Sequence, residues 1–183
     1  MLITGTLCIT ILRRIFPLAM AKAKPAKQKT ATDVADFSSL DGIVKALYDS
    51  ISFAPGRQPN YERMRLLFHR DARLIPPSTE KNGAVSALDL ETFITKSRES
   101  IVVSGLERKG FVETEIARRT QSFGSIVHIF STYESHSATD EAAPAQRGIN
   151  SIQIVKELGR FWVMTVLWDV ERPGHPIPRP YLL

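Results

Sequence analysis

Hydrophobic residues recur at every third or fourth position in the first half of the chain, a spacing that predicts amphipathic helices. In the first of these segments, Ile43, Leu47 and Ile51 fall on one side. A side-chain oxygen ahead of an apolar segment marks a helix start, because it can accept hydrogen bonds from the first free backbone N–H groups. The predicted helices are Leu40–Phe53, Tyr61–His69 after Asn60, and the segment from Asp89 to about Val102.

The second half of the chain changes to short segments that are typical of β-strands. Four strands are predicted between Phe111 and Val170, and a shorter strand, Asp71–Ile75, precedes the third helix. In the final strand, Arg160–Val170, both alternating sets of positions are mainly apolar, so we expect the strand to be covered on both faces. Helices followed by an antiparallel meander predict an α+β fold, in which a curved antiparallel sheet packs on three N-terminal helices. The turns are expected at Ser122–Gly124, Ser137–Gln146 and Leu158–Gly159.

Symmetric pairing of the strands across these turns separates two faces of the sheet. It places Ser131 beside Gln153 and Arg118 beside Val127. The more apolar face is predicted to pack against the helices and to line a pocket, and no carboxylate falls on it. Its candidate ligand-binding residues are Tyr133, Gln153, Ser131, Trp162, Trp168 and Arg118.

The opposite face combines the ionisable His128 with an apolar strip formed by Ile152, Ile154, Val163 and Leu167. Because so much apolar surface is unfavourable in water, a second subunit is the natural cover. The sequence therefore predicts a homodimer through this outer face of the sheet.

Composition and charge divide the chain into a tail and one domain. We expect a leader and disordered basic tail over residues 1–36, a folded domain over 37–171 and an extended proline-rich tail over 172–183. Residues 1–32 contain six of the 24 basic residues and none of the 19 acidic ones, which leaves 18 basic against 19 acidic residues from Asp33 onward. Proteins that bind nucleic acids carry a basic patch on the folded surface, so nucleic acid is not an expected partner.

The leader leaves more than one localisation open. Met1–Leu12 is apolar but too short to span a bilayer, and a start of translation at Met20 would leave a soluble basic tail. A cytoplasmic protein without membrane attachment is therefore the first prediction. Ala19–Ala21 resembles a signal-peptide cleavage site, so export through an atypical signal is an alternative, and an organelle transit peptide is another. Cys8 is the single cysteine, which excludes an internal disulfide and fits a reducing compartment.

Four segments carry a resemblance to a known family: Phe68–Leu74, Val127–Glu134, Arg147–Gln153 and Arg160–Trp168. With them, the chain resembles a nuclear transport factor 2-like domain of the SnoaL-like kind. The resemblance covers about Phe37–Glu171 and implies a cone, made by a curved sheet that closes over helices, and usually a dimer through the outer sheet face. Members include ketosteroid isomerases, scytalone dehydratase, polyketide cyclases and many proteins with no known reaction. The catalytic members place Asp, His or Tyr inside the cone.

Three residues are candidates for catalysis. His128, on a strand among apolar neighbours, is either a general base or a hydrogen-bonded histidine at a subunit interface. Asp71, at a helix-to-strand turn, either reaches into the cone as an acid or base or accepts hydrogen bonds from backbone N–H groups. Tyr133 would donate to a developing oxyanion. If they are buried, Tyr133 and Gln153 each need a hydrogen-bond partner. A ligand carbonyl or the backbone would supply it, or the two residues would bond to each other.

These observations leave three functions open. The first is the binding of a small, largely apolar molecule in the cone without a cofactor. The second is a lyase or isomerase on the same scaffold, and the third is a non-catalytic dimerisation module whose cone is filled by side chains. An open cone favours binding if it lacks an acid and catalysis if it contains one. No metal site is expected, because the four histidines form no cluster: His69, His128, His136 and His175.

Overall fold

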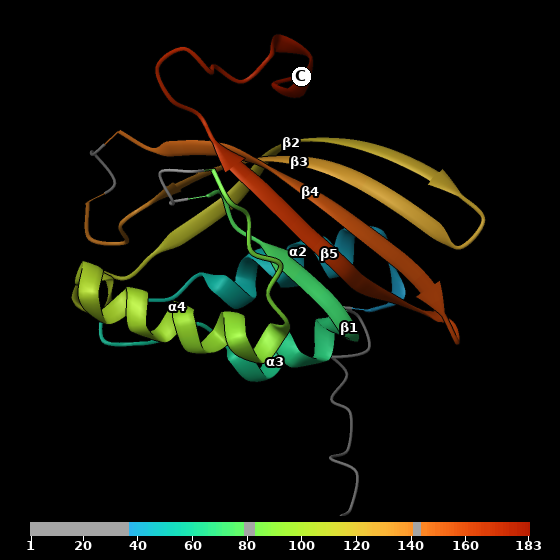
Figure 1. Cartoon of the computed structure of the whole chain (residues 1–183), viewed down its shortest axis with the longest axis horizontal. Coiled ribbons are helices and arrows are strands. Elements are labelled where there is room, and N and C mark those ends of the chain that lie inside the picture. Colours follow the sequence, from blue (N-terminus) through green and yellow to red (C-terminus); the bar gives the residue numbers. More distant parts are fainter. Residues whose placement is uncertain (1–36, 79–82, 141–143) are drawn as a thin grey trace, which may run out of the picture.

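The structure, a computed structural model, describes residues 37–78, 83–140 and 144–183. The predictions for the leader and basic tail, residues 1–36, lie outside the described residues. Helices come first along the chain and the antiparallel strands follow (Figure 1). The elements are α2 (Leu40–Ile51), α3 (Tyr61–Leu67), β1 (Phe68–Ile75), α4 (Leu90–Ser104), α5 (Leu106–Lys109), β2 (Val112–Phe123), β3 (Ile126–His136), β4 (Gln146–Glu157), β5 (Arg160–Val170) and the 3₁₀ turn η1 (Arg179–Tyr181).

The helices begin where side chains cap them. Asn60 Oδ1 accepts a hydrogen bond from the backbone N–H of Arg63 at 3.0 Å, and Asp89 Oδ1 accepts one from Thr92 at 2.8 Å. These two caps were predicted from the sequence. The end of α3 differs from the prediction, because the chain passes directly into β1 at Phe68.

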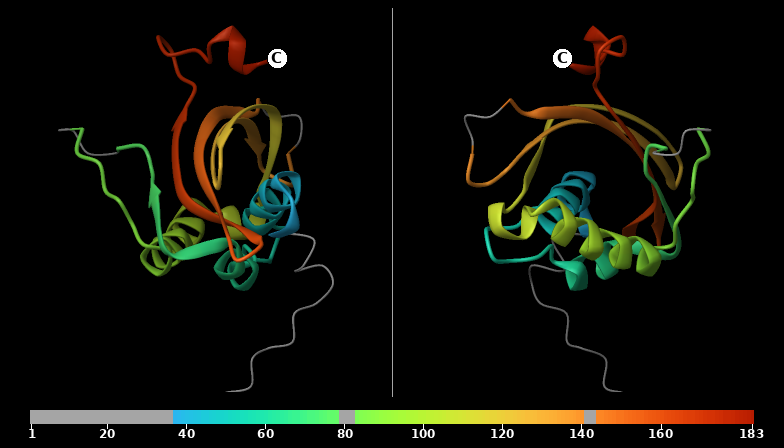
Figure 2. Two further views of the ribbon diagram at one scale, coloured as in Figure 1. Left: turned by 90° about the vertical axis from the view of Figure 1, so that its right-hand side faces the viewer. Right: turned by 60° about the vertical axis from the view of Figure 1, so that its left-hand side comes forward.

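The five strands form one sheet in the order β1-β5-β4-β3-β2, with β1 parallel to β5 and the other pairs antiparallel. The sheet curls strongly, so that its concave face arches over the helices (Figure 2). The helix α2 lies inside the curve and presents Ile43, Leu47 and Tyr48 among its buried residues. The predicted α+β fold, a curved antiparallel sheet on N-terminal helices, is confirmed.

Two β-bulges bend the sheet and change which side chains face the cone. Glu115 pairs with Tyr133 while Ala117 pairs with Thr132, so Ile116 is an extra residue in β2. In the same way, Met164 is an extra residue in β5. A bulge adds one residue to a strand of period two, so the residues on its two sides exchange faces.

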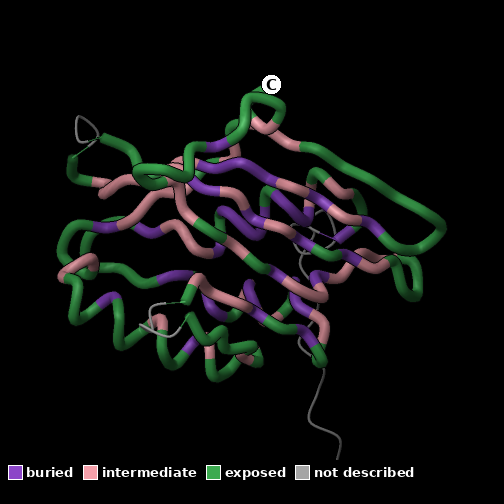
Figure 3. Tube along the Cα trace, turned by 45° about the horizontal axis from the view of Figure 1, so that its top comes forward, coloured by how far each residue is buried: buried purple, intermediate pink, exposed green. Residues whose placement is uncertain are grey.

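Along much of the central strands, buried residues alternate with residues of intermediate exposure (Figure 3). On β4 the buried set is Gly148, Asn150, Ile152 and Ile154, which pack toward the helices. Strand alternation predicted Ile152, Ile154 and Val163 on the outer face, and that prediction is wrong because all three are buried in the core.

The chain's own C-terminal segment covers part of the outer sheet face. Thr132 Oγ1 donates to the carbonyl of Tyr181 at 2.5 Å, and the Tyr181 ring lies 5.3 Å from that of Phe130. The guanidinium of Arg119 lies 5.8 Å from the centre of the Tyr181 ring. The proline-rich tail therefore returns to the sheet and is anchored there. In the parts of the chain that the structure describes, no helix is long and apolar enough to cross a membrane.

Candidate functional site

A cavity of about 210 Å³ lies between the concave face of the sheet and the helices. Its walls are mostly apolar, with Phe93 and Ile101 from α4 facing Val166 and Trp168 from β5. An engineered apolar cavity of about 150 Å³ can hold benzene, so this volume is sufficient for a molecule of one ring with substituents. Among the described residues, the polar side chains that line it are Tyr48, Ser97, Glu113, Tyr133 and Asn150.

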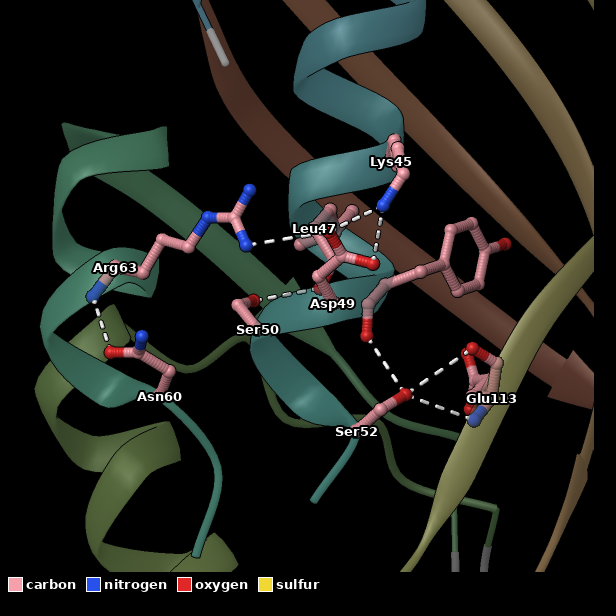
Figure 4. A network of polar contacts seen from close by, with 9 residues as sticks. Lys45, Leu47, Asp49, Ser50, Ser52, Asn60, Arg63 and Glu113 are labelled. Atoms are coloured by element: carbon pink, nitrogen blue, oxygen red, sulfur yellow. Dashed lines mark hydrogen bonds and ion pairs between the residues drawn. The ribbon is translucent and has the colours of Figure 1, made fainter. Parts of the chain in front are cut away.

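Glu113 supplies a carboxyl group to this cavity. It lies on β2 before the bulge at Ile116, and that bulge turns Glu113 and Glu115 toward the cone. The end of α2 fixes its backbone: Ser52 Oγ accepts from the Glu113 N–H at 3.1 Å and lies 3.3 Å from the Glu113 carbonyl (Figure 4). The same figure shows Lys45 and Arg63 paired with Asp49 at a different part of α2.

The environment of Glu113 favours its neutral form. Burial raises the pKa of the Glu113 carboxyl to about 7, while the hydrogen bond from Asn150 acts in the opposite direction. Asn150 Nδ2 lies 3.4 Å from Glu113 Oε1. A carboxyl with a pKa near 7 is present in both protonation states at neutral pH, so it can serve either as a proton donor or as a proton acceptor.

A buried hydrogen-bond network adjoins this carboxyl. Tyr48 Oη lies 2.7 Å from Ser131 Oγ and accepts from Asn150 Nδ2 at 3.1 Å. Ser131 Oγ in turn donates to the carboxylate of Glu115. Burial, together with the nearby carboxylates, raises the pKa of Tyr48, so its phenol is neutral at physiological pH.

Tyr133 offers a phenol that has no hydrogen-bond partner among the described residues, although the residue is 4% exposed. It pairs across the strands with Gly148, where a Cβ atom would collide with the Tyr133 hydroxyl and the carbonyl of Asp169. Glycine at this position therefore makes room for the phenol. Burial raises the pKa of Tyr133, so it remains a hydrogen-bond donor at neutral pH.

The two tryptophans have different positions. Trp168 lines the cavity and packs edge-on against Phe93, with the ring centres 6.1 Å apart. Trp162 is not at the cavity, because the extra residue Met164 reverses the parity between them. The guanidinium of Arg160 instead lies 3.4 Å from the centre of the Trp162 ring. The predicted inward position of Trp162 is wrong.

The predicted inward position of Gln153 is also wrong. Ser131 pairs with Asn150, three residues from the predicted Gln153, because the loop between β3 and β4 is not symmetric. Gln153 is exposed beside His128 on the outer face. Ser131 does face inward and is fully buried, where it bonds to Tyr48 rather than lining the cavity.

Three further candidates lie outside the cavity. Arg118 pairs with Glu115 and, at 2.7 Å, with Asp41. Asp71 is exposed in the middle of β1, where Arg70 lies 3.3 Å from its carboxylate. His128 lies on the outer face and its Nε2 is 3.0 Å from Ser151 Oγ. Neither Asp71 nor His128 is among the residues that line the cone.

Sequence reasoning missed three residues of the site: Glu113, Asn150 and Tyr48. Tyr48 had a usable signal, since it follows Leu47 on the apolar side of a predicted helix. The other two depend on a bulge and on an asymmetric loop, which strand alternation alone does not reveal. Within the described ranges, no three His, Cys, Asp or Glu side chains are grouped so that they could hold a metal ion.

No family model matches the sequence, and no curated protein matches it in sequence. Solved structures are similar in fold. An uncharacterised protein with a cystatin-like fold from Caulobacter vibrioides has a TM-score of 0.53 at 8% identity, over 74% of this chain and 89% of that one. A putative calcium/calmodulin-dependent kinase II association domain from Exiguobacterium sibiricum has a TM-score of 0.51 at 12% identity, over 81% of this chain and 99% of that one.

Proteins described as nuclear transport factor 2-like are also among the similar structures. One from Silicibacter pomeroyi, of unknown function, has a TM-score of 0.47 at 11% identity, over 72% of this chain and 92% of that one. The chain has a cystatin-like fold, which agrees with the predicted cone of a curved sheet that closes over helices. At these identities the similarity concerns the fold alone.

Proposed function

We propose that this protein binds a small, largely apolar molecule in its cone and holds it through one carbonyl or hydroxyl group. The observation that carries the proposal is an apolar cavity of about 210 Å³ that contains the Glu113 carboxyl and the phenol of Tyr133, to which no other described residue is hydrogen-bonded. Apolar walls with a few placed polar groups are typical of sites for small molecules. The dimerisation module with a filled cone is less well supported, because the cone has this open space.

Binding can be tested with cyclohexanone, which combines an apolar ring with one carbonyl acceptor. Titration followed by Trp168 fluorescence should give saturable binding. Val166→Phe fills the cavity from β5 and should abolish it. The matched control Gln153→Phe adds the same ring to the exposed outer face and should leave it unchanged. Equal binding by the Val166→Phe variant would place the ligand elsewhere and contradict the proposal.

A second candidate function is proton-transfer catalysis, of the kind that lyases and isomerases perform. It is favoured by the raised pKa of Glu113. In this mechanism the Glu113 carboxylate takes a proton from the carbon next to a ligand carbonyl. The electron pair of that C–H bond forms a C=C bond to the carbonyl carbon, the π pair of the C=O bond moves onto the oxygen, and Tyr133 donates a hydrogen bond to the resulting enolate. Glu113 then returns the proton to carbon. The base role first considered for Asp71 or His128 passes to Glu113, because neither of them lies at the cavity.

The exchange of carbon-bound hydrogen of cyclohexanone in D₂O, followed by proton NMR, tests this candidate. The protein should accelerate deuterium uptake next to the carbonyl, and Glu113→Gln should remove the acceleration. Tyr133→Phe should reduce it about 10²-fold, by loss of one oxyanion donor. If the wild-type protein binds cyclohexanone but exchange stays at the rate in buffer, binding stands and catalysis of this exchange is excluded.

A homodimer through the outer sheet face remains part of the proposal. The C-terminal segment covers Thr132, but Leu167 on the same face is 43% exposed. Light scattering at increasing protein concentration should give twice the monomer mass, and Leu167→Glu should give a monomer. A monomer at every concentration of the wild-type protein would exclude the dimer. Cytoplasmic location, and the absence of nucleic-acid and membrane partners, stay predictions from the sequence.

A further inference from the structure

Six side chains form one continuous series of hydrogen bonds from a partly exposed ion pair to the cavity. In order they are Arg118, Glu115, Ser131, Tyr48, Asn150 and Glu113. Arg118 is at the outer end, with its side chain 21% exposed, and Glu113 is at the cavity end. The middle members are buried, with Ser131 at 0%, Tyr48 at 5% and Asn150 at 7% exposure. The site described above uses only the inner end of this series.

The ion pair at the outer end of the series determines which group is the donor and which is the acceptor in each of the other hydrogen bonds. Glu115 receives two hydrogen bonds from Arg118, of which the Nε bond is 2.8 Å, and a carboxylate only accepts. Ser131 therefore donates its single hydroxyl hydrogen to Glu115, so it can only accept a hydrogen bond from Tyr48. Tyr48 must donate to Ser131, so toward Asn150 the phenol oxygen can only accept.

Asn150 must therefore donate a hydrogen bond to Tyr48, and only its amide nitrogen can do so. The Nδ2 atom lies 3.1 Å from Tyr48 Oη and 3.4 Å from Glu113 Oε1, so the same NH₂ group donates to both. If the amide turned over, its oxygen would face these two atoms. Tyr48 would then have to give its hydrogen to Asn150, and Glu113 would have to be protonated in order to donate.

We propose that Glu115 is a positioning residue for the cavity: through Ser131 and Tyr48 it fixes the orientation of Asn150, so that the amide donates to Glu113. Glu115 acts on the site without touching the cavity, since it is not among the residues that line it. This inference rests on the assignment of the cavity as the functional site.

The charges around Glu113 make the proposal testable, because charge repulsion and the proposal predict opposite changes in the pKa of Glu113 when Glu115 is replaced. The titratable groups that face it are Tyr48 from α2, Tyr133 from β3 and Glu115 on its own strand. The cavity residues contributed by α4, α5 and β5 carry no charge. By Coulomb's law alone, removal of the Glu115 charge would favour the ionised form of Glu113 and lower its pKa. We expect the pKa of Glu113 to rise instead, because an Asn150 amide that is no longer held in place can turn over and stabilise the protonated form of Glu113.

The experiment is a ¹³C NMR pH titration of the Glu113 carboxyl in protein labelled at the glutamate side chains, without any ligand. The Glu113 signal is assigned as the one missing from Glu113→Gln. In Glu115→Met, which has no oxygen to accept from Ser131, the midpoint of the Glu113 signal should rise by about one pH unit. Ser131→Ala breaks the series without changing a charge, and it should raise the midpoint in the same direction. Ser131→Ala keeps the test decisive if Glu115→Met does not fold.

The matched control is Asp41→Asn, which removes the other acidic partner of Arg118 but leaves the series intact. It should leave the midpoint unchanged. A second readout is the side-chain NH₂ of Asn150, whose two hydrogens should be protected from exchange in the wild type and in the control, but not in the other variants. A midpoint that falls or stays constant in Glu115→Met and Ser131→Ala would overturn the proposal. Because no ligand is used, a failure of ligand binding leaves this result unaffected.

Discussion

Asn150 Nδ2 lies 3.4 Å from Glu113 Oε1, although their strands, β4 and β2, are separated in the sheet by β3. Side chains of next-but-one strands can meet in this way because the sheet is strongly curved (Figure 2). Adjacent strands are about 4.8 Å apart, so in a flat sheet these two strands would be about 10 Å apart. The curvature thus places an amide donor against a carboxyl group that comes from another part of the sheet.

Asn150→Leu removes this donor and keeps a side chain of similar size. Because the hydrogen bond from Asn150 favours the charged form of Glu113, the pKa of Glu113 should rise above 7 by about one pH unit. A ¹³C titration of the carboxyl measures the change. Ser151→Ala, on the opposite face of the same strand, is the control and should have no effect. An unchanged midpoint in Asn150→Leu would show that the contact is not formed in solution.

Glu113 should make stability depend on pH between about 4.5 and 7. Its carboxyl pKa rises from 4.5 to about 7 on folding, so in this range the native state binds more protons than the unfolded state. Stability therefore falls as pH rises through the window. The contribution to the free energy of unfolding amounts to about 3 kcal/mol at most.

Urea denaturation of the wild type and of Glu113→Gln at pH 5, 6, 7 and 8 measures this contribution. The difference in free energy of unfolding between the two proteins should move in favour of the variant as pH rises to 7 and then level off. A constant difference over the series would mean that the carboxyl titrates normally in the folded protein.

Gly148→Ala should destabilise the protein by about 1–3 kcal/mol, because the added methyl group overlaps the Tyr133 phenol and the carbonyl of Asp169. Tyr133→Phe alone should have a much smaller effect, since the hydroxyl has no partner among the described residues. Chemical denaturation gives both values, and the double variant should recover only part of the loss because the Asp169 carbonyl remains. A neutral effect of Gly148→Ala would contradict the close packing of these strands.

The two tryptophans should respond differently to a molecule in the cone. In Trp162→Phe, the remaining Trp168 should show saturable quenching by cyclohexanone, because it lines the cavity. In Trp168→Phe, the remaining Trp162 stacks with Arg160 outside the cavity and should show only linear, collisional quenching. Saturable quenching of Trp162 would place the binding site elsewhere.

The sequence predicted the elements better than the faces of the sheet. Side-chain capping at Asn60 and Asp89 located two helix starts, because a cap is a local interaction between residues three apart. The apolar run of β5 and the turn at Gly124 located the meander. The small helix α5, which follows Gly105 in the left-handed region, was not predicted.

Fewer features of the candidate site than of the fold could be predicted from the sequence. Tyr133 and Trp168 were placed correctly on the concave face, but Glu113 was placed outside and the site was expected to lack an acid. One extra residue at Ile116 reverses the parity of β2, and one at Met164 reverses that of β5. Bulges of this kind are fixed by long-range packing and leave no mark in the alternation of a single strand.

The most direct test of the account is the titration midpoint of the Glu113 carboxyl in the wild-type protein, measured by ¹³C NMR with and without cyclohexanone. We expect a midpoint near pH 7 in the free protein and a change in that midpoint when the cavity is occupied. A midpoint near 4.3, the usual value for glutamate, that does not respond to cyclohexanone would contradict a buried carboxyl at a ligand-binding cone.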